Sequence, residues 1–115
     1  MNIEELREYC LSKKGATESF PFDEVTLVFK VGGKMFALTN LDGEPSVNLK
    51  CNPEKAIELR EQYSSIVPGY HMNKTHWNTV YMDSNIPDNL LKELVDLSYK
   101  LIVESLPKAK RNNLL

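Results

Sequence analysis

Hydrophobic positions along the chain follow two different spacings, which separate expected helices from expected strands. Near the N-terminus, an apolar stripe recurs at helical spacing behind Asn2, which can cap a helix while Glu5 reaches back to it. The stripe consists of Ile3, Leu6, Cys10 and Leu11. This pattern predicts a first helix that ends before Gly15 and covers a layer beneath it.

The spacing then changes to that of strands. The segments "VTLVFKV" (25–31) and "KMFALTN" (34–40) flank Gly32 and Gly33, a pair that predicts a two-residue hairpin turn. In that register Val31 faces Lys34, Phe29 faces Phe36 and Leu27 faces Leu38, and the last two pairs lie on the core side of the ribbon. On the other side, Lys30 faces Met35 and Val28 faces Ala37. A turn at "LDGEP" leads into a third strand, "SVNLK" (46–50).

The second half of the chain returns to helical spacing. Asn52, Pro53 and Glu54 form a helix start, and "WNTVYM" (77–82) is typical of a strand. A final long helix is expected from about Pro87 to Pro107, followed by a short basic tail, "KAKRNNLL". The order is helix, three strands, helix, one or two strands, helix, which predicts a single α+β domain over 1–115, a two-layer α/β sandwich with an antiparallel sheet.

Composition narrows the class of protein. The formal net charge is −2, which disfavours a surface devoted to nucleic acid but leaves room for a local basic strip. The N-terminus carries no long apolar core and no apolar run approaches the length of a membrane span, so we expect a cytoplasmic protein without a membrane partner. Cys10 and Cys51 lie far apart without a CxxC pattern, and we expect both to be buried free thiols.

The stretch "PGYHMNKTHWNTV" (68–80) is the richest in candidate chemistry. His71 and His76 supply only two metal ligands, and the segment from Gln62 to Met82 has no carboxylate, so we expect neither a metal nor a cofactor. A turn at "NK" (73–74) would bring His71 opposite His76 and Tyr70 opposite Trp77; otherwise the two histidines point apart. No nucleophile with an oriented base is apparent, so we expect a protein that is not an enzyme.

The same stretch has two other readings. Its amides, lysine, histidines and tryptophan suit contacts with phosphates, sugars or unstacked bases, and they equally suit an anchor at a protein interface. Alternatively, Trp77, Val80 and Tyr70 are core or half-core residues beside a tight connection.

Four separated blocks resemble the MmcQ/YjbR family of small bacterial proteins: "FPFDEVTLVFKVGGKMFAL", "VNLKCNPE", "PGYHMNKTHWNTV" and "LPK". The resemblance implies an α-β(3)-α-β(2)-α fold, called CyaY-like and similar to type III secretion chaperones, with two strands around Pro68 to Met82. It also implies a DNA-binding protein with a double wing of hairpins. The residues that match the recurring motif are Pro68, Gly69, Tyr70, His71, Met72, Asn73, Lys74, His76, Trp77, Asn78 and Thr79.

We therefore expect a binding domain for DNA, whose hairpin loops meet the phosphate backbone with modest, salt-sensitive affinity. The candidate contacts are Lys30, Lys34, His71, Asn73, Lys74, His76, Trp77 and Asn78. One alternative is a protein-interaction module with a partner on the sheet face that bears Val28, Met35 and Ala37. Another is a small-ligand pocket around His71, His76 and Trp77. The DNA hypothesis raises a structural question: whether Lys34, Lys50, Lys74 and the "KAKR" segment share one side of the molecule.

Overall fold

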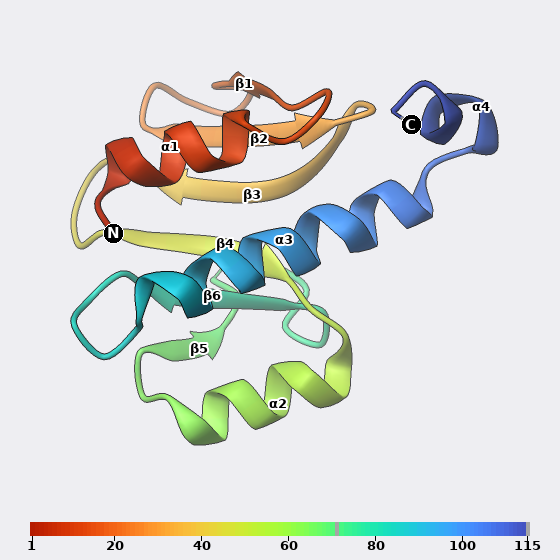
Figure 1. The fold of residues 1–115 in the computed structure, drawn as a ribbon. Helices are drawn as coiled ribbons and strands as arrows, with labels where there is room; N and C mark the ends of the chain where they lie inside the picture. The colour runs from red at the N-terminus through yellow and green to blue at the C-terminus, as the bar shows by residue number, and fades with distance from the viewer. Residues whose placement is uncertain (71, 115) are drawn as a thin grey trace.

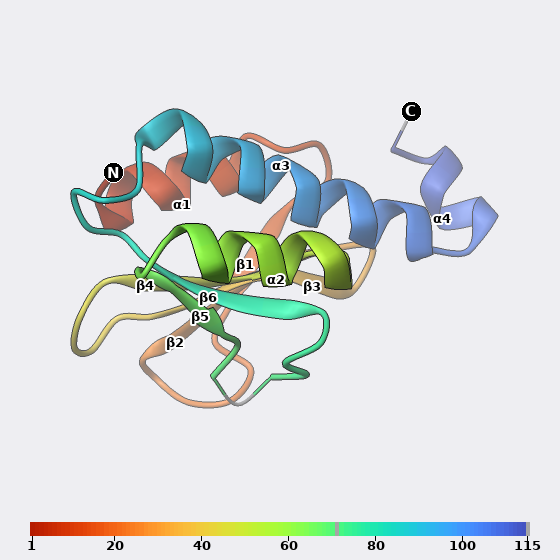
Figure 2. The same ribbon diagram turned by 90° about the horizontal axis from the view of Figure 1, so that it is seen from below.

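The computed structural model describes residues 1–70 and 72–114. The elements are α1 (Ile3–Leu11), β1 (Thr17–Ser19), β2 (Thr26–Val31), β3 (Lys34–Asn40), β4 (Ser46–Lys50), α2 (Pro53–Gln62), β5 (Ile66–Pro68), β6 (Trp77–Tyr81), α3 (Asp88–Ser105) and α4 (Lys108–Asn112). All strands join one antiparallel sheet in the order β1-β2-β3-β4-β6-β5. Helices α1, α2 and α3 cover one face of it (Figures 1 and 2). The predicted two-layer α+β class is confirmed.

Side-chain caps start the first two helices where the sequence predicts them. The side chain of Asn2 accepts a hydrogen bond from the amide of Glu5 at 2.8 Å, and the Glu5 carboxylate accepts one from the amide of Asn2 at 3.1 Å. Asn52 caps α2 by accepting from the amide of Lys55 at 2.9 Å, and Pro53 opens the helix. These contacts satisfy backbone donors that have no partner within the helix.

Two elements correct the predicted order. β1 is a short, polar edge strand that pairs with β2 through Thr17 and Lys30, and its sequence "TES" lacks an alternation that would identify it. The expected basic tail contains a helix, α4, which begins after Pro107. Proline lacks an amide donor and fixes a helix-compatible φ, so it closes one helix and opens the next. The segment before β6 forms β5, which pairs with β6. Of the one or two strands expected after α2, two are therefore present.

The hairpin of β2 and β3 has the predicted turn but a different register beyond it. Gly32 and Gly33 have φ of 58° and 81°, the conformation of a two-residue turn that favours glycine. Val31 pairs with Lys34 and Lys30 with Met35, as predicted, but Phe29 pairs with Ala37, Val28 with Leu38 and Leu27 with Thr39. Phe36 is the extra residue of a β-bulge, so the predicted Phe29–Phe36, Val28–Ala37 and Leu27–Leu38 pairs are wrong. Because of the bulge, Phe36 and Ala37 are both fully buried.

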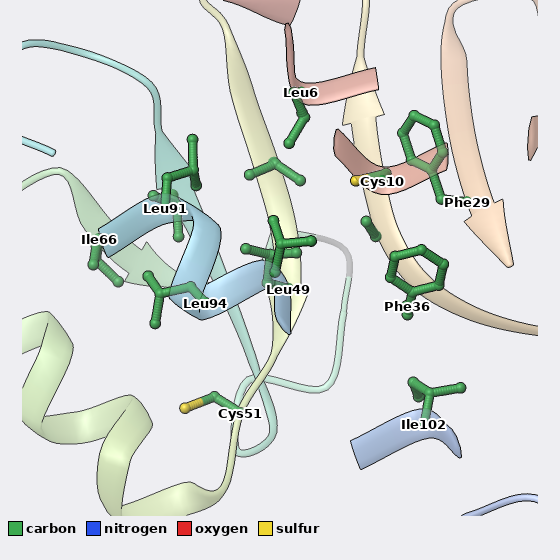
Figure 3. Packing of buried hydrophobic residues seen from close by; sticks show 14 of the residues in the cluster. Leu6, Cys10, Phe29, Phe36, Leu49, Cys51, Ile66, Leu91, Leu94 and Ile102 are labelled. Atoms are coloured by element: carbon green, nitrogen blue, oxygen red, sulfur yellow. The ribbon is translucent and has the colours of Figure 1, made fainter. Parts of the chain in front are cut away.

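The hydrophobic core lies between the sheet and the helices α1, α2 and α3. Figure 3 shows Cys10 of α1 close to Phe29 and Phe36, and Leu94 of α3 close to Leu49. Each of these side chains is buried. The α1 stripe and the alternating strand residues therefore meet in one continuous layer.

Ser98, in the middle of α3, places a hydroxyl group in the ladder between β3 and β4. It is fully buried, donates to the carbonyl of Phe36 at 2.5 Å and accepts from the amide of Lys50 at 2.9 Å. The β3–β4 register stops at Ala37 and Leu49, so Phe36 and Lys50 would form the next pair. The hydroxyl bridges these two backbone groups, and it ties the longest helix to both strands.

We expect Ser98→Ala to lower the free energy of unfolding by about 2–4 kcal/mol, because it leaves a buried carbonyl and a buried amide without a partner. Urea unfolding checks this, with an unchanged m-value showing that the cooperative unit is retained. The matched control is Ser105→Ala, on the same helix, whose exposed hydroxyl donates to Ile102 of its own helix. A loss for Ser98→Ala no larger than for this control would contradict the bridge.

Candidate functional site

The face of the sheet that the helices leave uncovered, here called the open face, contains a groove of about 640 Å³. The strands contribute Thr26, Met35, Leu38, Asn40, Ser46, Asn48, Thr79 and Tyr81, and the loops 20–25, 41–45 and 69–76 contribute Phe22, Asp23, Asp42, Glu44, Tyr70 and Met72. None of the described helix residues lines the groove. Figure 2 shows the β1–β2 and β5–β6 connections extending from the sheet on the side opposite α1, α2 and α3.

The charged side chains among the described residues of the groove are all acidic. These residues include Asp23, Asp42 and Glu44 but neither lysine nor arginine. Asp23 accepts from the amides of Val25 and Thr26, at 2.9 and 2.6 Å. These backbone hydrogen bonds, helped by the Thr26 hydroxyl, lower the pKa of the Asp23 carboxyl below its ordinary value and keep it ionised. The groove therefore repels a phosphate backbone.

Two buried polar side chains form the floor of the groove. The Thr79 hydroxyl accepts from the amide of Tyr70 at 3.0 Å and donates a short hydrogen bond to Oδ1 of Asn48. Asn48 is 8 % exposed, and its Nδ2 group donates to none of the described residues. The floor thus presents a preorganised amide donor to the groove.

The loop 69–76 takes a course that differs from a two-residue hairpin. The ladder between β5 and β6 ends at Pro68 and Asn78, and Asn73 then starts a turn by accepting from the amides of Thr75 and Trp77. Gly69 allows the close approach, because a Cβ there would lie 2.9 Å from the Trp77 carbonyl oxygen. The two-residue turn at "NK" (73–74), one of the two arrangements left open by the sequence, is therefore not formed, and Gly69 rather than Tyr70 pairs with Trp77. The predicted facing of His71 and His76 involves a residue outside the described ranges.

Two of the predicted nucleic-acid contacts are buried. Trp77 is 9 % exposed and Asn78 is 2 % exposed. The Asn78 amide group donates to the carbonyl of Ala56 in α2 at 3.3 Å, so it holds β6 to the helix layer. Neither side chain is accessible to a base or a phosphate, and neither lines the groove. The interpretation as core residues is confirmed for Trp77 and Val80 and is wrong for Tyr70, which is 69 % exposed.

The remaining predicted cations gather at one end of the sheet. In this antiparallel order, β2, β4 and β5 end where β3 and β6 begin. Lys34 opens β3, Lys50 closes β4 and Lys74 lies in the β5–β6 loop, so all three belong to this end, here called the basic end. Lys34 and Lys74 are exposed and Lys30 is half-buried. Asn73 is exposed and His76 half-buried in the same loop.

Helix α4 completes the basic end. The sequence predicted only a basic tail for this segment. Lys110 Nζ donates to the carbonyl of Gly32 at 3.3 Å, across 78 residues of chain. Lys34 Nζ donates to the carbonyl of Ser105 at 3.3 Å, at the C-terminus of α3, where partial negative charge attracts a cation. Figure 1 shows α4 beyond the tip of the β2–β3 hairpin. Thus Lys34, Lys50, Lys74 and the "KAKR" segment lie at one end of the sheet.

The surface predicted for a protein partner is not formed. Val28 lies on the open face but is fully buried, Ala37 is fully buried on the helix side, and Met35 is half-buried in the groove. The bulge at Phe36 separates Ala37 from the face that the simple register assigns to it. Exposed large hydrophobic side chains are instead Phe20, Phe22, Leu41, Ile57 and Tyr70.

Within the described residues, no group of three or more His, Cys, Asp or Glu side chains is arranged to hold a metal ion. None of the described helices is long and apolar enough to cross a membrane. Cys10 and Cys51 are both buried and unbonded to each other, as expected. The described surfaces include a polar groove with acidic loops and a basic strand end.

These features define a small α+β domain with helices on one face of an antiparallel sheet and a groove on the other. The family model YjbR matches residues 11–101. The protein described as uncharacterized YjbR of Escherichia coli K12 is 42 % identical over 116 residues, covering 100 % of this chain and 98 % of that protein. The chain belongs to the YjbR family.

Solved structures agree with this assignment. The crystal structure of Deinococcus radiodurans protein DR2400, with family-model domain DUF419, is 43 % identical, has a TM-score of 0.92 and covers 98 % of this chain and 87 % of that one. A crystal structure of a protein from Pseudomonas syringae is 26 % identical, with a TM-score of 0.77, and covers 89 % of this chain and 99 % of that one. The fold therefore persists at low sequence identity.

We expect both thiols to be unreactive in the folded chain. Burial raises the pKa of the Cys10 thiol from 9.0 to about 12 and also raises the pKa of Cys51, so both stay protonated at pH 8 and lack the nucleophilic thiolate. An aromatic disulfide reagent at pH 8 should titrate two thiols in urea and none in the native chain over the same minutes. Rapid stoichiometric reaction of the native chain would contradict this.

Proposed function

We propose that this domain binds the phosphate backbone of DNA at its basic end, without a chemical step. The observation that supports this most is a pair of reciprocal contacts between the tip of the β2–β3 hairpin and the C-terminal helices: Lys110 of α4 donates to the carbonyl of Gly32, and Lys34 of the hairpin donates to the carbonyl of Ser105 at the end of α3. Both ammonium groups contact backbone carbonyls. Among the described residues, no carboxylate forms an ion pair with either one.

The positions of the cations favour the hairpin tip over the stretch 68–80 as the main contact surface. Arg111 lies in the last turn of α4 beside Lys110, and Lys74 extends the surface along the strand end. Loops with carboxylates, such as Asp42 and Glu44, lie at the opposite end of the sheet. A duplex that approaches the basic end therefore meets positive charge first, although the whole chain has a net charge of −2.

The binding should be weak, dependent on salt and largely insensitive to base sequence. Four phosphate contacts, from Lys34, Lys74, Lys110 and Arg111, give a slope of about −3.6 for log affinity against log salt. The buried Trp77 provides no stacking platform, so base readout is not part of the proposal.

The test compares Lys34→Gln/Lys110→Gln with a control of equal charge change, Lys92→Gln/Lys100→Gln on α3. Fluorescence anisotropy with a labelled duplex from about 20 to 200 mM salt measures both affinity and slope. We expect the hairpin variant to bind more weakly with a slope near −1.8, while the control keeps the wild-type slope. Absence of binding at 50 mM salt, or equal loss in both variants, would overturn the proposal.

A further inference from the structure

The groove on the open face is a second site, with a chemistry opposite to that of the basic end. Its volume of about 640 Å³ lies within the roughly 300–1,000 Å³ typical of small-molecule pockets. The groove has a floor of strand residues and walls from three loops, so it is concave rather than a flat docking face. We propose that it binds a small organic cation that carries an aromatic ring and a carbonyl oxygen.

The acidic side chains of the loops are the reason for proposing a positively charged ligand. Asp23, Asp42 and Glu44 line the groove, and none of them forms an ion pair among the described residues. The hydrogen bonds from the amides of Val25 and Thr26 fix the Asp23 carboxylate in place. A protonated amine complements this field, whereas an anion is repelled.

The apolar residues of the groove are the reason for proposing an aromatic ring on the ligand. Met35 and Leu38 from β3 and Met72 from the β5–β6 loop are half-buried there. Phe22 and Tyr70 line the same groove from two loops and are 68 % and 69 % exposed. Aromatic rings and thioethers favour contact with a planar ring, and an aromatic face also attracts a cation.

The side chain of Asn48 is the reason for proposing a carbonyl oxygen on the ligand. This side chain is buried except for 8 % of its surface, yet its Nδ2 group has no acceptor among the described residues. Its Oδ1 is already engaged by the Thr79 hydroxyl, which the amide of Tyr70 holds in place. Nδ2 is not one of the fully buried atoms that lack a partner, so it is accessible from the groove that Asn48 lines. A ligand oxygen above the floor of the groove therefore meets a donor that the Thr79 contact already holds in place.

The test uses NMR titration of the ¹⁵N-labelled chain with three probes. Phenylalaninamide has the cation, the ring and the carbonyl; N-acetylphenylalanine keeps the ring and carbonyl but is an anion; butylamine is a cation without a ring. We expect saturable shifts at Asn48, Thr79 and the loop 20–25 with phenylalaninamide, and binding at least about tenfold weaker with each of the other probes. Equal binding of the anion, or no shift with phenylalaninamide at 10 mM, would overturn the proposal.

A charge-matched pair of variants tests the acidic loops. Asp42→Asn/Glu44→Gln changes two exposed side chains of the groove, and we expect the Kd for phenylalaninamide to rise about fivefold. Glu58→Gln/Glu61→Gln alters net charge equally on α2, outside the groove, and should leave Kd unchanged. Equal effects in both pairs would show nonspecific attraction to the whole chain and would contradict the site.

Discussion

The hydroxyl of Ser98 is the contact on which the arrangement of this domain depends. It connects the carbonyl of Phe36 to the amide of Lys50, where the β3–β4 ladder would otherwise have a gap, and it does so from the centre of the longest helix. The bulge at Phe36 lets two successive residues of β3 enter the core. At the tip of the same hairpin, Lys34 reaches the carbonyl of Ser105. Ser98 thus joins α3 to β3 and β4, the strands that carry Lys34 and Lys50 at the basic end.

Antiparallel topology explains how a chain with nearly balanced charge presents two surfaces of opposite character. The turns at one end of the sheet carry lysines, and α4 adds to them, while the 20–25 and 41–45 loops at the other end carry Asp23, Asp42 and Glu44. The acidic loops border the groove on the open face. The two proposals, a phosphate backbone at the basic end and an organic cation in the groove, assign each ligand to the surface whose described charged residues attract it.

Local patterns predicted the fold class, the first hairpin turn and the helix starts, because caps, glycine pairs and apolar periodicity act over a few residues. Such patterns do not predict the bulge. Phe36 is an apolar residue that suits the core both with and without the bulge, so only its packing against α3 distinguishes the two registers. Burial of Trp77 and Asn78 likewise depends on Gly69 and Ala56, contacts that spacing does not reveal. The groove could have been suspected from Asn48, a polar residue in the middle of an apolar strand. The position of α4 could not be predicted, because its contacts include one between Lys110 and a turn 78 residues away.

The most direct measurement is amide hydrogen exchange at Lys50, followed by NMR in the native chain and in Ser98→Ala. If the Ser98 hydroxyl completes the ladder, the Lys50 amide is protected to the level of its strand neighbours in the native chain. In Ser98→Ala, protection at Lys50 falls much further than protection at Leu49. Rapid exchange of Lys50 in the native chain, or protection that survives removal of the hydroxyl, would contradict the central role of this contact.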